Sequence, residues 1–326
     1  MKRSFSKCFI LLVLTSMVSL SLLSSTAPSF AADKIRVGFI VDVSIIPLYV
    51  MKAKKIDDKY GLDVELKPFA RGSDAYTAFR AKAVDMILDM GTNTAAEFFL
   101  TGVPIKVIRA FQYPHFSLLV KRDSPIKRVQ ELKGQKIAVT SFGATSYWLT
   151  AVAFNALGMD VKNDVKIQTG APAVLLSSLG KGEIVSVTLW EPYVTQAIKT
   201  GDFKILVDPA EIYASKYKEP FYHTCISVHG DFYDKNRDPL KKFLSAINES
   251  ISYTLKNSAE SNEISSKTEI NLSPDDLRKV RSGWKGWVIE DINDNQLREI
   301  NNMYRRMFEL KILGGEVEAR KFWLRP

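Results

Sequence analysis

Two successive parts of this sequence alternate short apolar segments with segments of helical spacing, and this alternation constrains the fold most strongly. The first part has predicted strands over 35–41, 62–69, 84–90 and 105–111, with helices predicted over 45–55, 73–82 and 91–100. In the second part, the predicted strands are 136–139, 165–168, 185–189 and 205–207, and the helices are 145–157, 172–180 and one opening at Glu191-Pro192. Such alternation is typical of mostly parallel sheets covered by helices on both faces. We therefore predict an α/β fold with two lobes.

The last third of the chain has a different pattern. One more apolar strand is predicted over 223–228, and helices follow over 238–257, 273–283 and 293–313. A single strand followed by helices indicates that the chain returns to the first lobe. We therefore assign 32–115 to the first lobe, 116–221 to the second and 222–326 to the return. Two hinge connections are expected near 113–117 and 221–224.

The N-terminus has the pattern of a cleavable signal peptide. Lys2, Arg3 and Lys7 precede an apolar stretch over 8–23, and Ser29-Phe30-Ala31 places small residues at the −3 and −1 positions. The apolar stretch is shorter than the roughly 20 residues that a spanning helix needs. We predict a signal peptide over 1–31, cleavage after Ala31 and a periplasmic mature protein.

Metal and catalytic patterns are weak in this sequence. Cys225 is the one cysteine after residue 31, and its apolar surroundings predict a buried side chain without a disulfide. No His-Glu-x-x-His or Gly-x-Ser-x-Gly pattern occurs. His115 and His223 both fall at the expected hinge and are predicted to approach each other. Lysines and arginines are mixed with acids along the chain, despite a net charge of +9. We expect no enzyme activity, metal, cofactor or nucleic acid.

The candidate binding residues follow the predicted strands, because open α/β sheets bind ligands beyond the carboxyl ends of their strands. Those strand ends carry small hydroxyls or Asn at helix N-termini, where unpaired N–H groups attract anions. Plain N-capping is the alternative at each turn. Aromatic residues gather at the same places and suit a flat or partly apolar ligand. The candidates are Ser44, Gly91, Thr92, Asn93, Tyr113, Ser141, Gly143, Ala144, Thr145, Ser146, Trp190 and Glu191.

Charged candidates lie beside these turns. Asp42, Asp89 and Glu191 stand near strand ends, where each could be a cap or the partner of a ligand amine. Arg71 and Arg109 could face an anion, or could lie on the surface.

Several stretches together resemble a known family: "IRVGFIVDVSIIPLYVMKAK", "VDMILDMGTNTA", "GATSYWLTAVAFNALGMD" and "LWEPYVTQA". They are similar to the periplasmic nitrate/sulfonate/taurine-type binding proteins of ABC importers, which include binders of thiamine pyrimidine precursors. The resemblance implies a two-lobed type II periplasmic-binding fold that closes on its ligand. It also implies a monomer that delivers a small anion or zwitterion to a permease and ATPase. The implied ligand contacts are Ser44, Gly91, Thr92, Asn93, Gly143, Ala144, Thr145, Ser146, Trp190 and Glu191.

Three alternatives stay open at this point. The ligand could be a neutral heteroaromatic, such as a thiamine-type pyrimidine. The same fold resembles thiamine-pyrimidine synthases, but those carry a cysteine-rich motif that this chain lacks. The protein could also report to a receptor instead of a permease.

Overall fold

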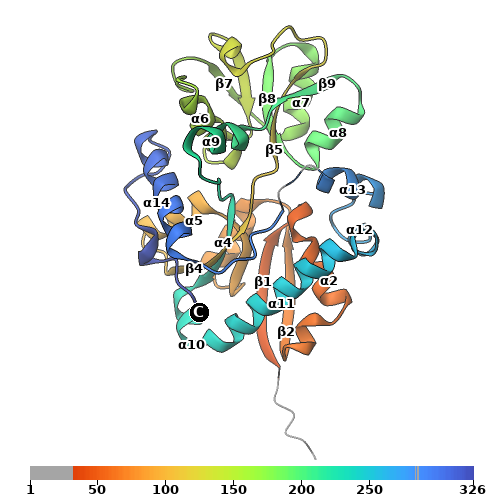
Figure 1. The fold of residues 1–326 in the computed structure, drawn as a ribbon, viewed down its shortest axis with the longest axis vertical. Coiled ribbons are helices and arrows are strands. Elements are labelled where there is room, and N and C mark those ends of the chain that lie inside the picture. The colour runs from red at the N-terminus through yellow and green to blue at the C-terminus, as the bar shows by residue number, and fades with distance from the viewer. Residues whose placement is uncertain (1–31, 283, 285) are drawn as a thin grey trace, which may run out of the picture. The chain divides into compact units, whose positions relative to one another are not determined.

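The computed structural model describes residues 32–326 except 283 and 285, so the predicted signal peptide and its cleavage site lie outside the described residues. The described chain forms two five-stranded sheets with helices on their faces (Figure 1). This confirms the predicted α/β fold. No helix in the described part is long and apolar enough to cross a bilayer.

The first sheet has the strand order β2-β1-β3-β10-β4. β10 runs antiparallel to both of its neighbours, and the other four strands share one direction. The strands are β1 (Asp33–Ile40), β2 (Leu62–Phe69), β3 (Met86–Gly91), β4 (Ile105–Gln112) and β10 (Thr224–His229). All residues of β3 and β10 are buried, although both strands include polar residues, such as Asp89 in β3 and Ser227 in β10.

Helices cover both faces of the first sheet. On one face, Val37 and Phe39 of β1 join a cluster with helices α2 and α11. On the other, Val107 of β4 joins Phe98 and Tyr304 from α5 and α14. The helices that surround this sheet are α2 (Ile46–Ala53), α3 (Ile56–Lys59), α4 (Gly72–Arg80), α5 (Thr92–Leu100), α10 (Gly230–Lys235), α11 (Arg237–Lys256), α12 (Ser258–Ser265), α13 (Pro274–Ser282) and α14 (Asp294–Glu309). Single turns of 3₁₀ helix are η1 (Val43–Ile45) and η3 (Ala319–Lys321).

The second sheet repeats this plan with the order β7-β6-β8-β5-β9. Here β5 is the antiparallel strand, paired with β8 and β9. The strands are β5 (Phe116–Lys121), β6 (Lys136–Val139), β7 (Lys166–Thr169), β8 (Ser186–Trp190) and β9 (Phe203–Val207). Its helices are α6 (Thr145–Ala156), α7 (Pro172–Lys181), α8 (Tyr193–Lys199) and α9 (Pro209–Tyr217), and η2 (Val129–Leu132) is a 3₁₀ turn.

The chain passes between the two sheets at short connections. Residues 113–115 join β4 to β5, and residues 218–223 join α9 to β10. The late strand β10 therefore lies in the first sheet, between β3 and β4. The predicted hinge motion at these connections stays a prediction.

Several predicted boundaries were wrong. Helix α4 begins at Gly72, one residue before its predicted start, and its N-cap residue is Arg71. Pro192 precedes α8 instead of opening it, after a cis peptide bond with Glu191. The helices α9 and α12 were not predicted. By contrast, the predicted start at 273 is close to the observed start of α13, and Ser273 caps that helix by accepting the Asp276 N–H at 3.2 Å.

Candidate functional site

A cavity of about 600 Å³ lies where the carboxyl ends of β1, β3, β6 and β8 meet the helices that follow them. We call it the large cavity. Both sheets contribute to its walls, as expected for open α/β sheets. Its lining residues are Ile40, Asp42, 70–73, Tyr76, Asp89, Gly91, Asn93, Thr94, Phe116, Thr140, Ser141, 143–146, Pro172, Trp190, Tyr193, His223 and Thr224.

The first residues of several helices line the large cavity, and the N-termini of α4, α5 and α6 among them have no side-chain cap. Helix α4 begins after Arg71, α5 after Gly91 and α6 after Ala144. The first N–H groups of a helix have no partner within the helix, and the helix dipole is positive there. An anionic group of a ligand could therefore take the place of the missing caps.

The turn before α6 is held by one buried hydroxyl. Ser146 Oγ accepts the Thr140 N–H at 3.1 Å and lies 2.8 Å from Thr140 Oγ1. Ser146 is buried, whereas Thr145 is half-buried and Ser141 is exposed. The Ser146 hydroxyl thus fixes the turn, and its neighbours face the cavity.

Two carboxylates form part of the first-sheet wall. Asp89 is 2% exposed, and its oxygens accept the Ile40 N–H at 3.1 and 3.2 Å. Burial raises the pKa of Asp89 well above its usual value, and the nearby Asp42 raises it further. Asp42 Oδ1 accepts the backbone N–H of Ser44 at 2.6 Å and its hydroxyl at 2.5 Å.

Two histidines stand beside this wall, with ring centroids 5.8 Å apart, which confirms the predicted approach. His223 lines the large cavity, and its Nδ1 lies 3.3 Å from Gln112 Nε2. Burial lowers the pKa of His223 well below its ordinary value, and His115 lowers it further. Burial also lowers the pKa of His115, although Asp42 opposes this shift from 3.8 Å away. Both imidazoles are therefore neutral near neutral pH.

An aromatic wall completes the large cavity. Trp190 is half-buried and contacts Phe116 and Tyr193, at centroid distances of 5.9 and 5.2 Å. Tyr76 projects from α4, and burial raises its pKa to about 12. Flat surfaces of this kind suit a partly apolar ligand body.

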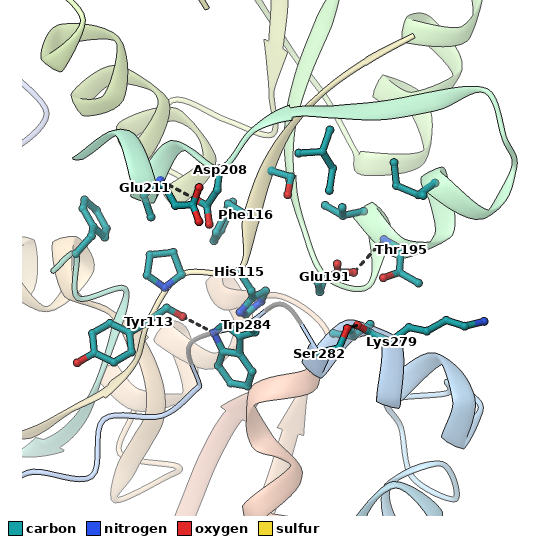
Figure 2. Close-up of a pocket in the computed structure, with 18 of the residues that line it drawn as sticks. Tyr113, His115, Phe116, Glu191, Thr195, Asp208, Glu211, Lys279, Ser282 and Trp284 are labelled. Carbon is teal, nitrogen blue, oxygen red and sulfur yellow. Dashed lines mark hydrogen bonds between the residues drawn. The ribbon is translucent and has the colours of Figure 1, made fainter. Parts of the chain in front are cut away.

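A second cavity of about 430 Å³ is lined by the connection 113–116, and we call it the small cavity (Figure 2). Phe116 lines both cavities. Glu191 faces the small cavity, where its carboxylate accepts the Thr195 N–H at 3.0 Å and burial raises its pKa. Tyr113 also lines it, and its carbonyl accepts Trp284 Nε1–H at 2.9 Å.

The structure brings together eight of the twelve predicted binding residues in the large cavity. These are Gly91, Asn93, Ser141, Gly143, Ala144, Thr145, Ser146 and Trp190. The other four lie elsewhere. Tyr113 and Glu191 line the small cavity, and Ser44 and Thr92 are fully buried. The Thr92 hydroxyl donates to the Tyr222 carbonyl at 2.9 Å.

The two arginine candidates lie in different parts of the structure. Arg109 is buried and bonds to Asn248 and Asp291, away from the large cavity. Arg71 lines the large cavity, but its guanidinium forms a two-point ion pair with Asp74.

Sequence reasoning missed Tyr76, Thr94, Phe116, Pro172 and Thr224. Tyr76 lies one helical turn inside α4 and Thr94 lies in the first turn of α5, so a periodicity argument from the helix starts could have found them. Cys225 is buried and free, as predicted. Among the described residues, no group of three or more His, Cys, Asp or Glu is placed to hold a metal ion.

Comparison with known proteins decides the family. Residues 42–261 match the family described as "NMT1/THI5 like". The chain belongs to this family. The "Putative aliphatic sulfonates-binding protein" of Escherichia coli (strain K12) is 30% identical over 95 residues, 29% of each chain. The protein of the same description from Bacillus subtilis (strain 168) is 24% identical over 226 residues, 67% of this chain and 64% of that one. The chain thus spans less than two thirds of the length of either relative.

The fold is shared with solved binding proteins. The periplasmic aliphatic sulphonate binding protein SsuA from Escherichia coli superposes with a TM-score of 0.78 at 18% identity. The match covers 89% of this chain and 97% of that one. This likeness confirms the predicted periplasmic-binding-protein fold.

Proposed function

We propose that this NMT1/THI5-like protein is the periplasmic solute-binding component of an ABC importer. It captures a small organic anion or zwitterion in the large cavity and delivers it to a membrane permease with its ATPase. The observation that carries the proposal is the meeting of three uncapped helix N-termini in one cavity. Such a cradle holds an anionic group without a metal or a catalytic base.

The relatives support this reading at the level of solute class. Both curated relatives are described as aliphatic sulfonates-binding proteins, and SsuA is a periplasmic one. The aromatic wall of Trp190, Phe116 and Tyr193 could pack against the carbon skeleton of such a solute. The protein then acts by binding and release, with closure about the connections 113–115 and 218–223.

A thermal-shift screen tests the proposal on purified protein that begins at residue 32. The panel contains alkanesulfonates, aminosulfonates, nitrate, aromatic carboxylates and pyrimidines. A solute at 100 times its Kd stabilises the folded state by about 2.7 kcal/mol, a visible rise in Tm. We expect Trp190→Ala and Thr145→Ala to abolish the rise. Ile205→Ala in the small cavity and Thr101→Ala at the end of α5 serve as controls and should keep it.

Two results would contradict the proposal. A Tm rise that survives both Trp190→Ala and Thr145→Ala would place the solute outside the large cavity. A rise in Tm with pyrimidines alone would show that the solute is not an anion.

A further inference from the structure

The fixed side-chain charge in the large cavity is acidic, although the helix N-termini there favour anions. Among the described lining residues, Arg71 is the one Lys or Arg, and its side chain is 75% exposed and already paired with Asp74. Where Asp89 is ionised, a nitrogen-free anion would therefore meet helix dipoles on one side and two carboxylates without a cationic partner on the other. Like charges in a poorly solvated cavity repel strongly.

Asp42 and Asp89 are placed to accept more hydrogen bonds than the protein gives them. Asp42 uses Oδ1 for Ser44, while its Oδ2 has only His115 at 3.8 Å. Asp89 accepts from the Ile40 N–H and from its own backbone N–H. An ionised carboxylate has room for about four hydrogen bonds, so both retain acceptor capacity.

A third group beside the pair points independently to a ligand. Thr224 is 3% exposed and lines the large cavity, and its hydroxyl has no hydrogen-bond partner among the described residues. In the sheet, Thr224 pairs with Gly91, two residues beyond Asp89 on the same strand. Residues two apart on a strand share a face, so Thr224 and Asp89 are diagonal neighbours. A buried hydroxyl without a partner is costly unless a ligand supplies one.

We propose that Asp42 and Asp89 bind a protonated nitrogen of the solute, with the Thr224 hydroxyl as an additional acceptor. The inference rests on the proposed function and narrows its solute class to zwitterions. The anionic end of the solute lies at the uncapped helix starts, and the ammonium or amidinium end lies at the two carboxylates. The carboxylates also exclude nitrogen-free anions, because such anions leave the pair without a counter-charge.

Matched pairs of probes test this inference by isothermal titration calorimetry. Each pair has the same length and the same sulfonate, and differs by one protonated nitrogen. The pairs are taurine with propane-1-sulfonate, homotaurine with butane-1-sulfonate, and 4-(aminomethyl)benzenesulfonate with 4-ethylbenzenesulfonate. We expect the nitrogen-bearing member of at least one pair to bind about ten-fold or more tightly than its partner.

Carboxamide variants then identify the groups that make the distinction. Asp42→Asn and Asp89→Asn keep an acceptor oxygen for Ser44 and Ile40, so the fold should persist. Each should weaken the nitrogen-bearing probe about ten-fold and strengthen the nitrogen-free one, which reverses or abolishes the preference. Asp63 is an exposed residue of β2, so Asp63→Asn makes the same change of charge away from the cavity. This control should alter the affinity for neither probe.

The outcomes separate the inference from the proposed function. If the nitrogen-free members bind the wild-type protein as well as their partners do, and Trp190→Ala abolishes that binding, the inference fails and the proposed function stands. A preference for nitrogen that survives both Asp variants also overturns the inference. If neither member of any pair binds, that result also counts against the inference. The proposed function is then judged separately by mass spectrometry, which would detect a solute that co-purifies with the wild type but not with Trp190→Ala.

Discussion

Adjacent residues at one strand end face different cavities in this protein. Trp190 ends β8 and lines the large cavity, whereas Glu191 follows it and lines the small cavity. Successive side chains of an extended chain point in opposite directions. The sequence could therefore place a site at this strand end, but it could not say which of the two residues faces it.

Ser44 and Thr92 lie outside the large cavity because their hydroxyls bond within the protein. Their hydroxyls are buried in local structure, with Ser44 bonded to Asp42 and Thr92 to the Tyr222 carbonyl. Short polar residues at a turn can serve either the backbone or a ligand. Only the return strand β10, distant in sequence, decides which use applies to Thr92, because it brings residues 222–223 beside that hydroxyl.

The raised pKa of Asp89 gives binding a defined pH dependence. Below that pKa the carboxyl is protonated and neutral, and a cationic nitrogen prefers the ionised form. We expect the affinity for a nitrogen-bearing probe to rise with pH through a midpoint above the ordinary Asp range, with proton release on binding. Calorimetry in buffers of different ionisation enthalpy measures that release.

Other titratable groups around Asp89 do not reverse the direction of this pH dependence. The titratable and charged groups that face the pair are Tyr76 on α4, Cys225 on β10, His115 and His223 on the two connections, and Arg71. Burial keeps the tyrosine, thiol and imidazoles neutral near neutral pH. Asp89→Asn should remove the pH dependence, and a dependence that persists in this variant would assign it to another group.

At the scale of elements, the start of α6 is the best-defined part of the site. Its sequence, with Gly143 and several small hydroxyls after a buried strand, predicted both the helix and its exposed N-terminus. The strand-helix alternation of both sheets was predictable for the same reason, since buried parallel strands have continuous apolar runs. Helix α9 was not, because Pro209–Tyr217 has a weak apolar pattern and its packing comes from tertiary contacts with α6, although Asp208 caps it locally through the Ala210 N–H.

Ser146→Ala should loosen the turn before α6. The change removes the acceptor of the Thr140 N–H and leaves that group without its bonded partner. We expect a loss of about 1–3 kcal/mol in the free energy of unfolding, measured with urea, together with weaker solute binding. Ser245→Ala, on the exposed face of α11, is the control and should change stability by less than about 0.5 kcal/mol. Unchanged stability in Ser146→Ala would show that the hydroxyl does not fix the turn.

At the scale of the whole molecule, one ion pair joins the second sheet's helices to the returning chain. Lys199 of α8 bonds to Asp276 of α13, and Lys199 and α13 residues also line the small cavity. The two cavities share Phe116 in their walls. We expect closure around the large cavity to move α8 relative to α13 and to stretch this pair.

Breaking the pair should favour closure and tighten binding. An exposed pair of this kind is worth about 0.2–1 kcal/mol, so Asp276→Asn should lower Kd by at most about five-fold at low salt. The charge swap Lys199→Asp with Asp276→Lys should restore the wild-type Kd, and high salt should remove the difference. Weaker binding in Asp276→Asn would show that the pair supports the closed state instead.

The position of β10 has a consequence for how the chain is made. Strands β3 and β4 have no shared neighbour until residues 224–229 are available, so the first sheet stays incomplete while two thirds of the chain are synthesised. Pairing over such long sequence separations is slow, because the intervening loop must close first. In a nascent chain of this topology the first sheet is therefore completed late, after all strands of the second sheet have already been made.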